Sequence, residues 1–327
     1  MVEEKKFDES LDQLGEEELL NRLQRFMPIG QIEDDTAQIN SFGKSLLINT
    51  DVLVEGVHFS KETISPENVG WKAIATNISD LACSGVDQIL GITVGMIAPP
   101  STQWSWVESV YTGIEKALNQ FGGELIGGDC SCGQDRVLAI TAIGTLGKLR
   151  LHRSNALEGD YLLTSGPHGL SRLGLALLLK DSQINKNQLP DVLKEKAITA
   201  HQRPNPPLTA LRALEISKPK NLPWRAAGTD SSDGLLAAVQ NICNSSQCQA
   251  VLDANSLPKA QNWPSGELWD RWCINGGEDF ELIVSLPPIW GEAFLKTFPY
   301  SQKIGLIKSG RPEIIWNDGK KIKKSIF

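Results

Sequence analysis

Helix-like and strand-like patterns of apolar residues alternate along this chain, and the alternation constrains its fold more than any other feature. Apolar residues spaced three and four apart predict helices at residues 10–26, 67–82, 104–121 and 169–180. Apolar runs bounded by turn residues predict strands at 45–52, 89–97, 137–147, 161–166 and 280–286. Because strands and helices take turns along the chain, we expect an α/β fold.

The turn-rich segment LHRSNALEGD, residues 151–160, separates two rounds of this alternation. A chain of 327 residues is about twice the usual size of a single domain. We therefore predict two domains, residues 1–150 and residues 151–327.

The charge balance disfavours several classes of partner. The chain has 39 Asp and Glu residues and 32 Lys and Arg residues, which give a net charge of −7. It therefore has no general attraction to nucleic acid or to anionic lipid. A phosphate-bearing partner would be held locally, through a metal ion. The N-terminus is charged, no apolar run is long enough to span a bilayer, and the six cysteines form no CxxC pair. We expect a cytoplasmic protein with reduced thiols that binds neither nucleic acid nor membrane.

Carboxylates recur in short segments beside glycine and other turn residues. They are Asp34, Asp35, Asp51, Asp80, Asp129, Asp230, Asp233, Glu278 and Asp279. Each one alone is most simply a turn or capping residue. Gathered in one place they would repel one another unless a hard cation neutralised them, and oxygen ligands are what Mg²⁺ prefers. The pattern therefore predicts a magnesium site that works on phosphates, with Asp80 in the last turn of a helix and Asp129 in a glycine-rich loop after a strand.

The common nucleotide-binding signatures are missing. The segment GKS at 43–45 resembles the end of a Walker loop, but Gln38 stands where that motif needs glycine. Neither the protein-kinase motifs nor a GxGxxG fingerprint is present. If the protein uses ATP, it does so through another architecture.

Eight motifs in order carry a resemblance to a known family. They are DDTAQI, NTDVLVEGVHF, NISDLACSG, LIGGD, HRSNALEGDYLLTSG, RPNPPL, TDSSDGL and GGEDFEL. Over about residues 12–310 the chain resembles the thiamine-monophosphate kinases, which belong to the aminoimidazole ribonucleotide synthetase-like superfamily. The resemblance implies transfer of the γ-phosphoryl group of ATP to thiamine monophosphate. It also implies an N-terminal mixed sheet with helices that binds ATP and Mg²⁺ and forms a homodimer, followed by a C-terminal α/β domain.

The resemblance also implies roles for individual residues. The magnesium positions are Asp35, Asn49, Thr50, Asp51, Asp80, Asp129, Asp230 and Asp233. The nucleotide positions are Tyr111, Gly128, Asp129, Arg153 and Ser232, of which Tyr111 also fits a packing role on its helix. The substrate positions are His58 and Glu278, with Phe327 or Trp316 as an aromatic cover. No general base is assigned, because the acceptor is an already ionised phosphate oxygen.

Two alternatives stay open, and three departures from the family pattern motivate the second of them. Glu33 and Asn49 replace a glycine and a serine, and Cys130, Ser131 and Cys132 stand where an arginine is expected. One alternative is another synthetase or kinase of the superfamily, although the selenophosphate branch needs a cysteine earlier than Cys83. The other is a binding module for thiamine phosphate or nucleotide that has lost turnover.

Overall fold

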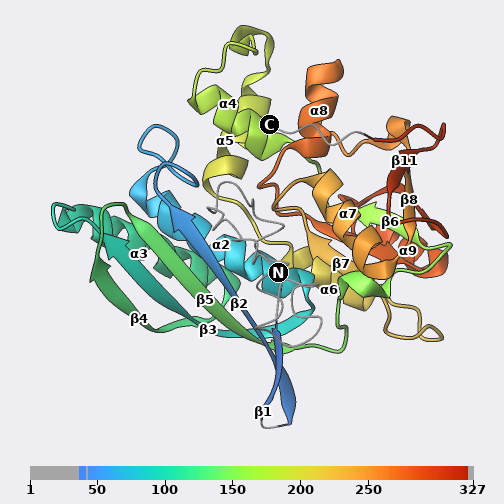
Figure 1. Ribbon diagram of the computed structural model, residues 1–327, viewed down its shortest axis with the longest axis horizontal. Helices are drawn as coiled ribbons and strands as arrows, with labels where there is room; N and C mark the ends of the chain where they lie inside the picture. Colours follow the sequence, from blue (N-terminus) through green and yellow to red (C-terminus); the bar gives the residue numbers. More distant parts are fainter. Residues whose placement is uncertain (1–36, 42, 323–327) are drawn as a thin grey trace, which may run out of the picture.

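The computed structural model describes residues 37–41 and 43–322, which form two β-sheets and the helices packed on them (Figure 1). The first sheet has the strand order β1-β2-β5-β3-β4. Its strands are β1 (Ala37–Ser41), β2 (Lys44–Val54), β3 (Val86–Ala98), β4 (Glu124–Cys132) and β5 (Val137–Leu146). Neighbouring strands run antiparallel, except that β4 lies parallel to β3 at the edge of the sheet.

Two helices cover one face of this sheet. Alternate residues of β2 and β5, such as Leu47, Leu53 and Ile140, are buried on that face. Helix α2 (Pro66–Cys83) packs against β2 and β5, and α3 (Trp104–Phe121) packs in turn against α2. The Ser65 hydroxyl caps α2 by accepting a hydrogen bond from the Asn68 backbone N–H.

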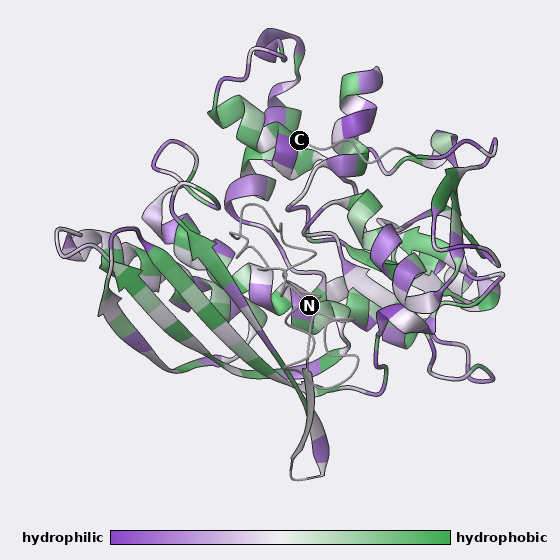
Figure 2. Cartoon of the chain, in the orientation of Figure 1, coloured by the Kyte–Doolittle hydropathy of each residue, from purple (hydrophilic) through white to green (hydrophobic). Residues whose placement is uncertain are grey.

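On the other face of the first sheet, the part of the chain that the structure describes places no helix, and we call it the open face. On it lie Val52, Ala139 and Gly95, which are register partners across three strands, and Asp129 follows them on β4. Val52 is 45% exposed, and the green stripes of apolar residues on these strands are visible in Figure 2. An exposed sheet face with apolar residues is a surface that another molecule can cover.

The second sheet has the order β11-β8-β10-β6-β9-β7. Its strands are β6 (Tyr161–Thr164), β7 (Ala227–Asp230), β8 (Gln249–Leu252), β9 (Leu282–Leu286), β10 (Gln302–Lys308) and β11 (Ile314–Trp316). All five residues of β9 are buried, since helices or other elements cover both of its faces. The helices of this half are α4 (Leu170–Leu178), α5 (Asp191–Gln202), α6 (Leu208–Ile216), α7 (Leu235–Ser246), α8 (Glu267–Asn275) and α9 (Pro288–Thr297).

The two halves share a hydrophobic core. Ile74 and Ile78 of α2 belong to the same buried cluster as Leu211 of α6 and Leu282 of β9. The indole of Trp71, also on α2, donates a hydrogen bond to the Pro204 carbonyl oxygen of the second half at 2.9 Å. Helix α2 therefore lies between the two sheets, and groups from both halves converge beside it.

Most of the predicted elements are confirmed, and two predictions are wrong. Helix α3 has the predicted bounds, and α2 extends the predicted helix by one residue at each end. Asp129 does not lie in a loop, because β4 continues through the glycines that predicted one. Phe280 does not belong to a strand that starts there: its backbone is left-handed, and β9 begins at Leu282. The predicted helix at 10–26 lies outside the described residues. No described helix is long and apolar enough to cross a membrane.

Candidate active site

An acidic cavity of about 480 Å³ lies where the two halves meet. It is lined by Asp51, Val52, Leu53, His58, Lys72, Thr76, Asp80, Asp230, Ser232, Asp233, Glu278 and Phe280. These residues come from β2 and the loop after it, from α2, from the end of β7 and the turn after it, and from the turn before β9. Five of the lining side chains are carboxylates, which makes the cavity suited to cations or to anions bound through cations.

Asn49 and Asn77 organise the wall of the cavity between β2 and α2. The Asn49 amide nitrogen donates to the Asp80 carboxylate at 2.8 Å and to the Asn77 side-chain oxygen at 3.1 Å. The same Asn77 oxygen accepts the Asp51 backbone N–H at 3.1 Å. These bonds orient the Asn49 amide, and its Oδ1 is buried with no hydrogen-bond partner. A buried oxygen without a donor is a candidate metal ligand.

Asp230 ends β7 and is held from two sides. One carboxylate oxygen accepts the Ser79 hydroxyl of α2 at 2.9 Å, and the other accepts the Ser232 hydroxyl at 2.8 Å. The Glu278 backbone N–H donates to the Ser232 carbonyl oxygen at 2.7 Å, so the TDSSDG and GGEDF turns are joined. Glu278 and Phe280 have left-handed backbones, with φ of +63° and +51°. Such strain in non-glycine residues is concentrated at functional sites.

Glu278 is held by an ion pair and by further hydrogen bonds. Its Oε1 lies 2.6 Å from the Lys72 ammonium, and its Oε2 lies 3.3 Å from His201 Nδ1. Burial opposes ionisation of this carboxyl, but the hydrogen bond from His201 and the charge of Lys72 outweigh it and lower its pKa to about 2. Glu278 is therefore an anion at neutral pH.

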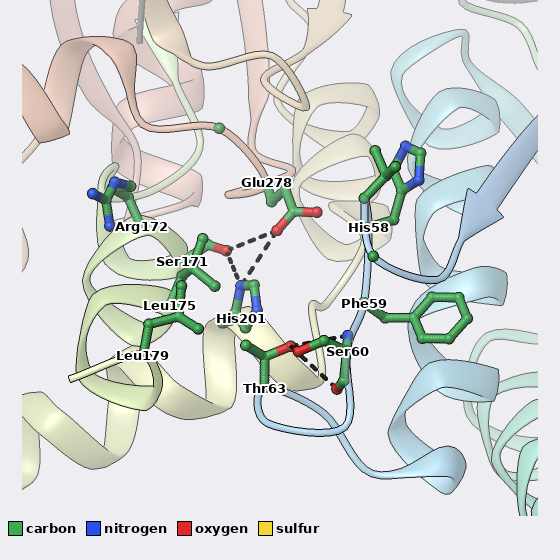
Figure 3. Close-up of a pocket in the computed structure, with 13 residues that line it drawn as sticks. His58, Phe59, Ser60, Thr63, Ser171, Arg172, Leu175, Leu179, His201 and Glu278 are labelled. Carbon is green, nitrogen blue, oxygen red and sulfur yellow. Dashed lines mark hydrogen bonds and ion pairs between the residues drawn. The ribbon is translucent and has the colours of Figure 1, made fainter. Parts of the chain in front are cut away.

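A second cavity of about 390 Å³ adjoins the acidic one, and His58 and Glu278 line both. Figure 3 shows Glu278 between Ser171 and His201 on one side and the His58 loop on the other. The remaining wall includes apolar side chains, among them Leu175 of α4 and Leu179 just after that helix, and polar ones such as Thr63 and Arg172. We call this space the side cavity; it combines an anionic end with an apolar wall.

Most of the described candidate residues converge, and several do not. The acidic cavity brings together Asp51, His58, Asp80, Asp230, Ser232, Asp233 and Glu278, and Asn49 adjoins it through Asp80. Arg153 lies nearby, because its Nε donates to the hydroxyl of Thr229, the neighbour of Asp230, at 3.1 Å. Thr50 instead pairs with the Thr141 hydroxyl on the open face of the sheet. Asp35 and Phe327 lie outside the described residues, and Trp316 packs against the core of the second half.

Asp129 is separated from these acids within one chain. It faces the open side of the first sheet, whereas Asp51 pairs with the buried Ile140 on the helix side. Three strand spacings, roughly 14 Å, lie between Asp129 and β2. Its neighbour Gly128 has no room for a side chain, since a Cβ there would meet the Val94 carbonyl oxygen at 2.1 Å. Tyr111 lines a groove of about 540 Å³ between α3 and β4.

Lys72 is the charged cavity residue that sequence reasoning missed, and the same reasoning also missed the partners Asn77, Ser79 and His201. Lys72 is 1% exposed, lines the acidic cavity and pairs with Glu278. The available signal was a single charged residue within the apolar run of the predicted helix, since a buried lysine almost always has a specific partner. The partner could not be known from the sequence, because Glu278 lies 206 residues later.

The donor set of the acidic cavity fits Mg²⁺. Within the part of the chain that the structure describes, no three His, Cys, Asp or Glu side chains are close enough together to hold one ion. Mg²⁺ usually takes only one or two protein carboxylates and completes its shell with waters and substrate phosphates. The carboxylates and the unpartnered oxygen of Asn49 meet that requirement.

The fold is that of the AIR synthase-related proteins. Residues 33–146 match the family model described as AIR synthase related protein, N-terminal domain. Solved structures of the hydrogenase maturation protein HypE have the same fold, with a TM-score of 0.73 at 14% identity for the one in complex with HypF, over 95% of this chain and 100% of that one.

Closer relatives identify the family within this class. A thiamine-monophosphate kinase of Prochlorococcus marinus is 58% identical over 326 residues, which cover 100% of this chain and 98% of the relative. The one of Synechococcus elongatus is 42% identical over 92% of this chain and 90% of its own. The structure of AaThiL complexed with AMPPCP and TMP has a TM-score of 0.84 and 29% identity, over 98% of both chains. The chain belongs to the thiamine-monophosphate kinase family.

Proposed function

We propose that this protein transfers the γ-phosphoryl group of ATP to the phosphate of thiamine monophosphate, giving thiamine diphosphate and ADP. The observation that carries the proposal is the acidic cavity, which places Asp51, Asp80, Asp230 and Asp233 together with His58 and Glu278. Membership of the kinase family supports the same reaction. Phosphoryl transfer needs positioning and neutralisation of charge more than covalent chemistry, which suits a cavity of this composition.

The carboxylates would act by holding Mg²⁺ against the phosphates. Asp51, Asp80 and Asp230, with the amide oxygen of Asn49, are the residues we assign to this role, and Asp233 to the nucleotide end. Bound there, Mg²⁺ would neutralise charge on the transferring phosphoryl group. Ser79, Asn77 and Ser232 keep their carboxylate and amide partners in fixed orientations before substrate arrives. The attacking phosphate oxygen is already ionised, so no protein base is needed to activate it.

We assign the side cavity to the rings of thiamine monophosphate. Thiamine carries a permanent positive charge on its thiazolium ring, and Glu278 supplies an anion at the junction of the two cavities. The apolar wall formed by Leu175 and Leu179 suits the ring faces. In this arrangement the substrate phosphate points into the acidic cavity, toward the metal-binding carboxylates.

We also propose a homodimer formed through the open face of the first sheet. That face carries exposed apolar residues such as Val52 and Ile97, and the described helices that pack on this sheet lie on the other face. Asp129 lies on the open face, so in such a dimer it would lie in the interface. Asp129, Thr50 and the nucleotide residues Tyr111, Gly128, Arg153 and Ser232 remain predictions, as does the domain boundary after residue 150.

The test is a direct assay of product. The protein is incubated with ATP, Mg²⁺ and thiamine monophosphate, and thiamine diphosphate is measured by chromatography with EDTA as control. Product that requires the metal supports the kinase. Tight binding of thiamine monophosphate without product would support a binding module, which Cys130, Ser131 and Cys132 in place of the expected arginine motivate. Product only with another phosphate acceptor would support a different branch of the superfamily.

A further inference from the structure

We propose that Lys72 is a positioning residue that sets the distance between His58 and Glu278, and thereby affects the affinity for the phosphate acceptor more than the affinity for ATP. The inference rests on the proposed function, in that the acceptor enters where the two cavities meet. It concerns a residue of α2 that the motif analysis did not assign to any role.

The burial of Lys72 requires a reason. Its side chain is 1% exposed, on a helix whose other residues from Val69 to Ser79 are also buried. Removing an ammonium ion from water costs several kcal/mol unless a partner compensates for the lost hydration. An apolar side chain at this position would avoid that cost, so the ion pair is retained for something other than packing.

The contacts of Lys72 connect two separate parts of the site. Its Nζ lies 2.6 Å from Glu278 Oε1, in the second half of the chain. The same Nζ donates to the His58 backbone carbonyl oxygen at 3.4 Å, in the loop after β2. His58 and Glu278 line both cavities, so these two residues form the border between them. One ammonium group on a rigid helix therefore holds both sides of that border.

The other oxygen of Glu278 is also held. Oε2 lies 3.3 Å from His201 Nδ1 of α5 and 3.5 Å from the Ser171 hydroxyl of α4. Figure 3 shows the two groups that contact Oε2. With Lys72 on the other oxygen, the carboxylate has a fixed orientation. If Lys72 is lost, Oε1 loses its partner and the carboxylate is free to turn away from the border.

The positive charge of Lys72 also favours binding of the phosphate acceptor. Among the described lining residues of the acidic cavity, Lys72 is the one Lys or Arg beside five carboxylates. An anionic acceptor phosphate must pass this border, and the ammonium reduces the repulsion that it meets there. Of the nucleotide positions, Tyr111 and Gly128 lie on α3 and β4, whereas Ser232 and Asp233 line the same cavity as Lys72. The bonds of Lys72 go to His58 and Glu278, so its loss should weaken acceptor binding more than ATP binding.

The experiment compares Lys72→Met with Lys72→Arg and with the control Lys116→Met. Lys116 lies on α3 in an exposed pair with Glu67 at 2.8 Å, so the control removes a lysine without touching the site. KM is measured separately for thiamine monophosphate and for ATP, and binding of thiamine monophosphate is measured by calorimetry. We expect Lys72→Met to raise the KM and the Kd for thiamine monophosphate at least 10-fold and to change the KM for ATP less than 3-fold. Lys72→Arg should recover part of the loss.

Other results would overturn the inference. Equal rises in both KM values, or a fall in kcat with unchanged KM, would mean that Lys72 acts on the fold or on chemistry. If Lys72→Met does not fold, Lys72→Arg and Glu278→Gln carry the test, and both must shift the acceptor KM selectively. Calorimetry distinguishes failure of this inference from failure of the proposed function. If the wild type neither binds thiamine monophosphate nor makes product, the proposed function is refuted. If the wild type binds thiamine monophosphate and the variants bind it equally well, only the role of Lys72 is refuted.

Discussion

Individual residues show which parts of the site the sequence revealed. The recurrence of acids in short segments pointed to Asp51, Asp80 and Asp230, because the chemistry of a carboxylate is local and each motif is short. The structure adds the hydroxyl and amide groups that orient them, such as Ser79 on the adjoining helix. Ser79 is distant from Asp230 in sequence, and their pairing depends on how α2 packs between the sheets.

Asp230 is the residue at which the metal role can be tested most cleanly. Asp230→Asn keeps the size of the side chain but removes a formal charge from a buried group whose oxygens already accept two hydroxyls. We expect kcat to fall at least about 100-fold while the thermal midpoint changes little, because a metal ligand acts mainly in the transition state. Asp318→Asn, an exposed change near the C-terminus, is the control and should retain activity. Full activity in the Asp230 variant would remove it from the metal site.

His168 gives the protein a defined pH dependence of stability. It is fully buried, its Nε2 has no partner, and burial lowers its pKa to about 4 from an ordinary 6.5. Between pH 6.5 and pH 4, His168 takes up a proton in the unfolded chain but not in the folded one. The free energy of unfolding therefore falls as the pH drops through this range. The expected loss is about 3 kcal/mol.

Urea unfolding at several pH values measures this loss. In His168→Leu the fall in unfolding free energy between pH 6.5 and pH 4 should be smaller than in the wild type. The comparison of slopes cancels the other groups that titrate in the same range. Identical slopes in the two proteins would show that His168 is not the group responsible.

At the scale of elements, local patterns predicted the helices well and β4 badly. The apolar spacing of 104–121 is a property of one segment, so the bounds of α3 followed from it. Gly127 and Gly128 predicted a loop, but pairing with β3 extends the strand through them, and Gly128 is required by the close approach of Val94. Tertiary pairing of this kind is not visible in the segment itself.

Helices α2 and α3 pack through two glycines. A Cβ on Gly70 would meet the Val110 carbonyl oxygen at 1.9 Å, and a Cβ on Gly113 would meet that of Glu67 at 1.8 Å. Gly113→Ala should push the helices apart and lower the free energy of unfolding by about 1–3 kcal/mol, the usual cost of overpacking. Gly127→Ala, where the nearest atom is 4.0 Å away, is the matched control for denaturant unfolding. An equal effect of both substitutions would contradict close helix packing at Gly113.

At the scale of the whole molecule, the placement of Asp129 was the least predictable feature. The sequence grouped it with the other acids, whereas within one chain it faces the open side of the sheet, away from Asp51. Only the three-dimensional order of the strands separates the two. The proposed homodimer would place Asp129 in an interface, and it thereby links oligomeric state to activity.

Ala139→Arg tests that link. Ala139 lies in the middle of the open face on the central strand β5, so a charged side chain there should prevent a second sheet from packing on it. We expect light scattering to give the mass of a dimer for the wild type and of a monomer for the variant, with activity falling in parallel. A monomeric wild type with full activity would rule out the dimer as a requirement.

The central claim is that the cavity between the two halves performs a metal-dependent phosphoryl transfer. The most direct measurement follows the γ-phosphoryl group of labelled ATP in the presence of Mg²⁺ and thiamine monophosphate, for the wild type and for Asp230→Asn. We predict label in thiamine diphosphate, one for each ADP formed, with the wild type and at least 100-fold less with the variant. Absence of labelled thiamine diphosphate with the wild type, or equal rates for the two proteins, would contradict the account.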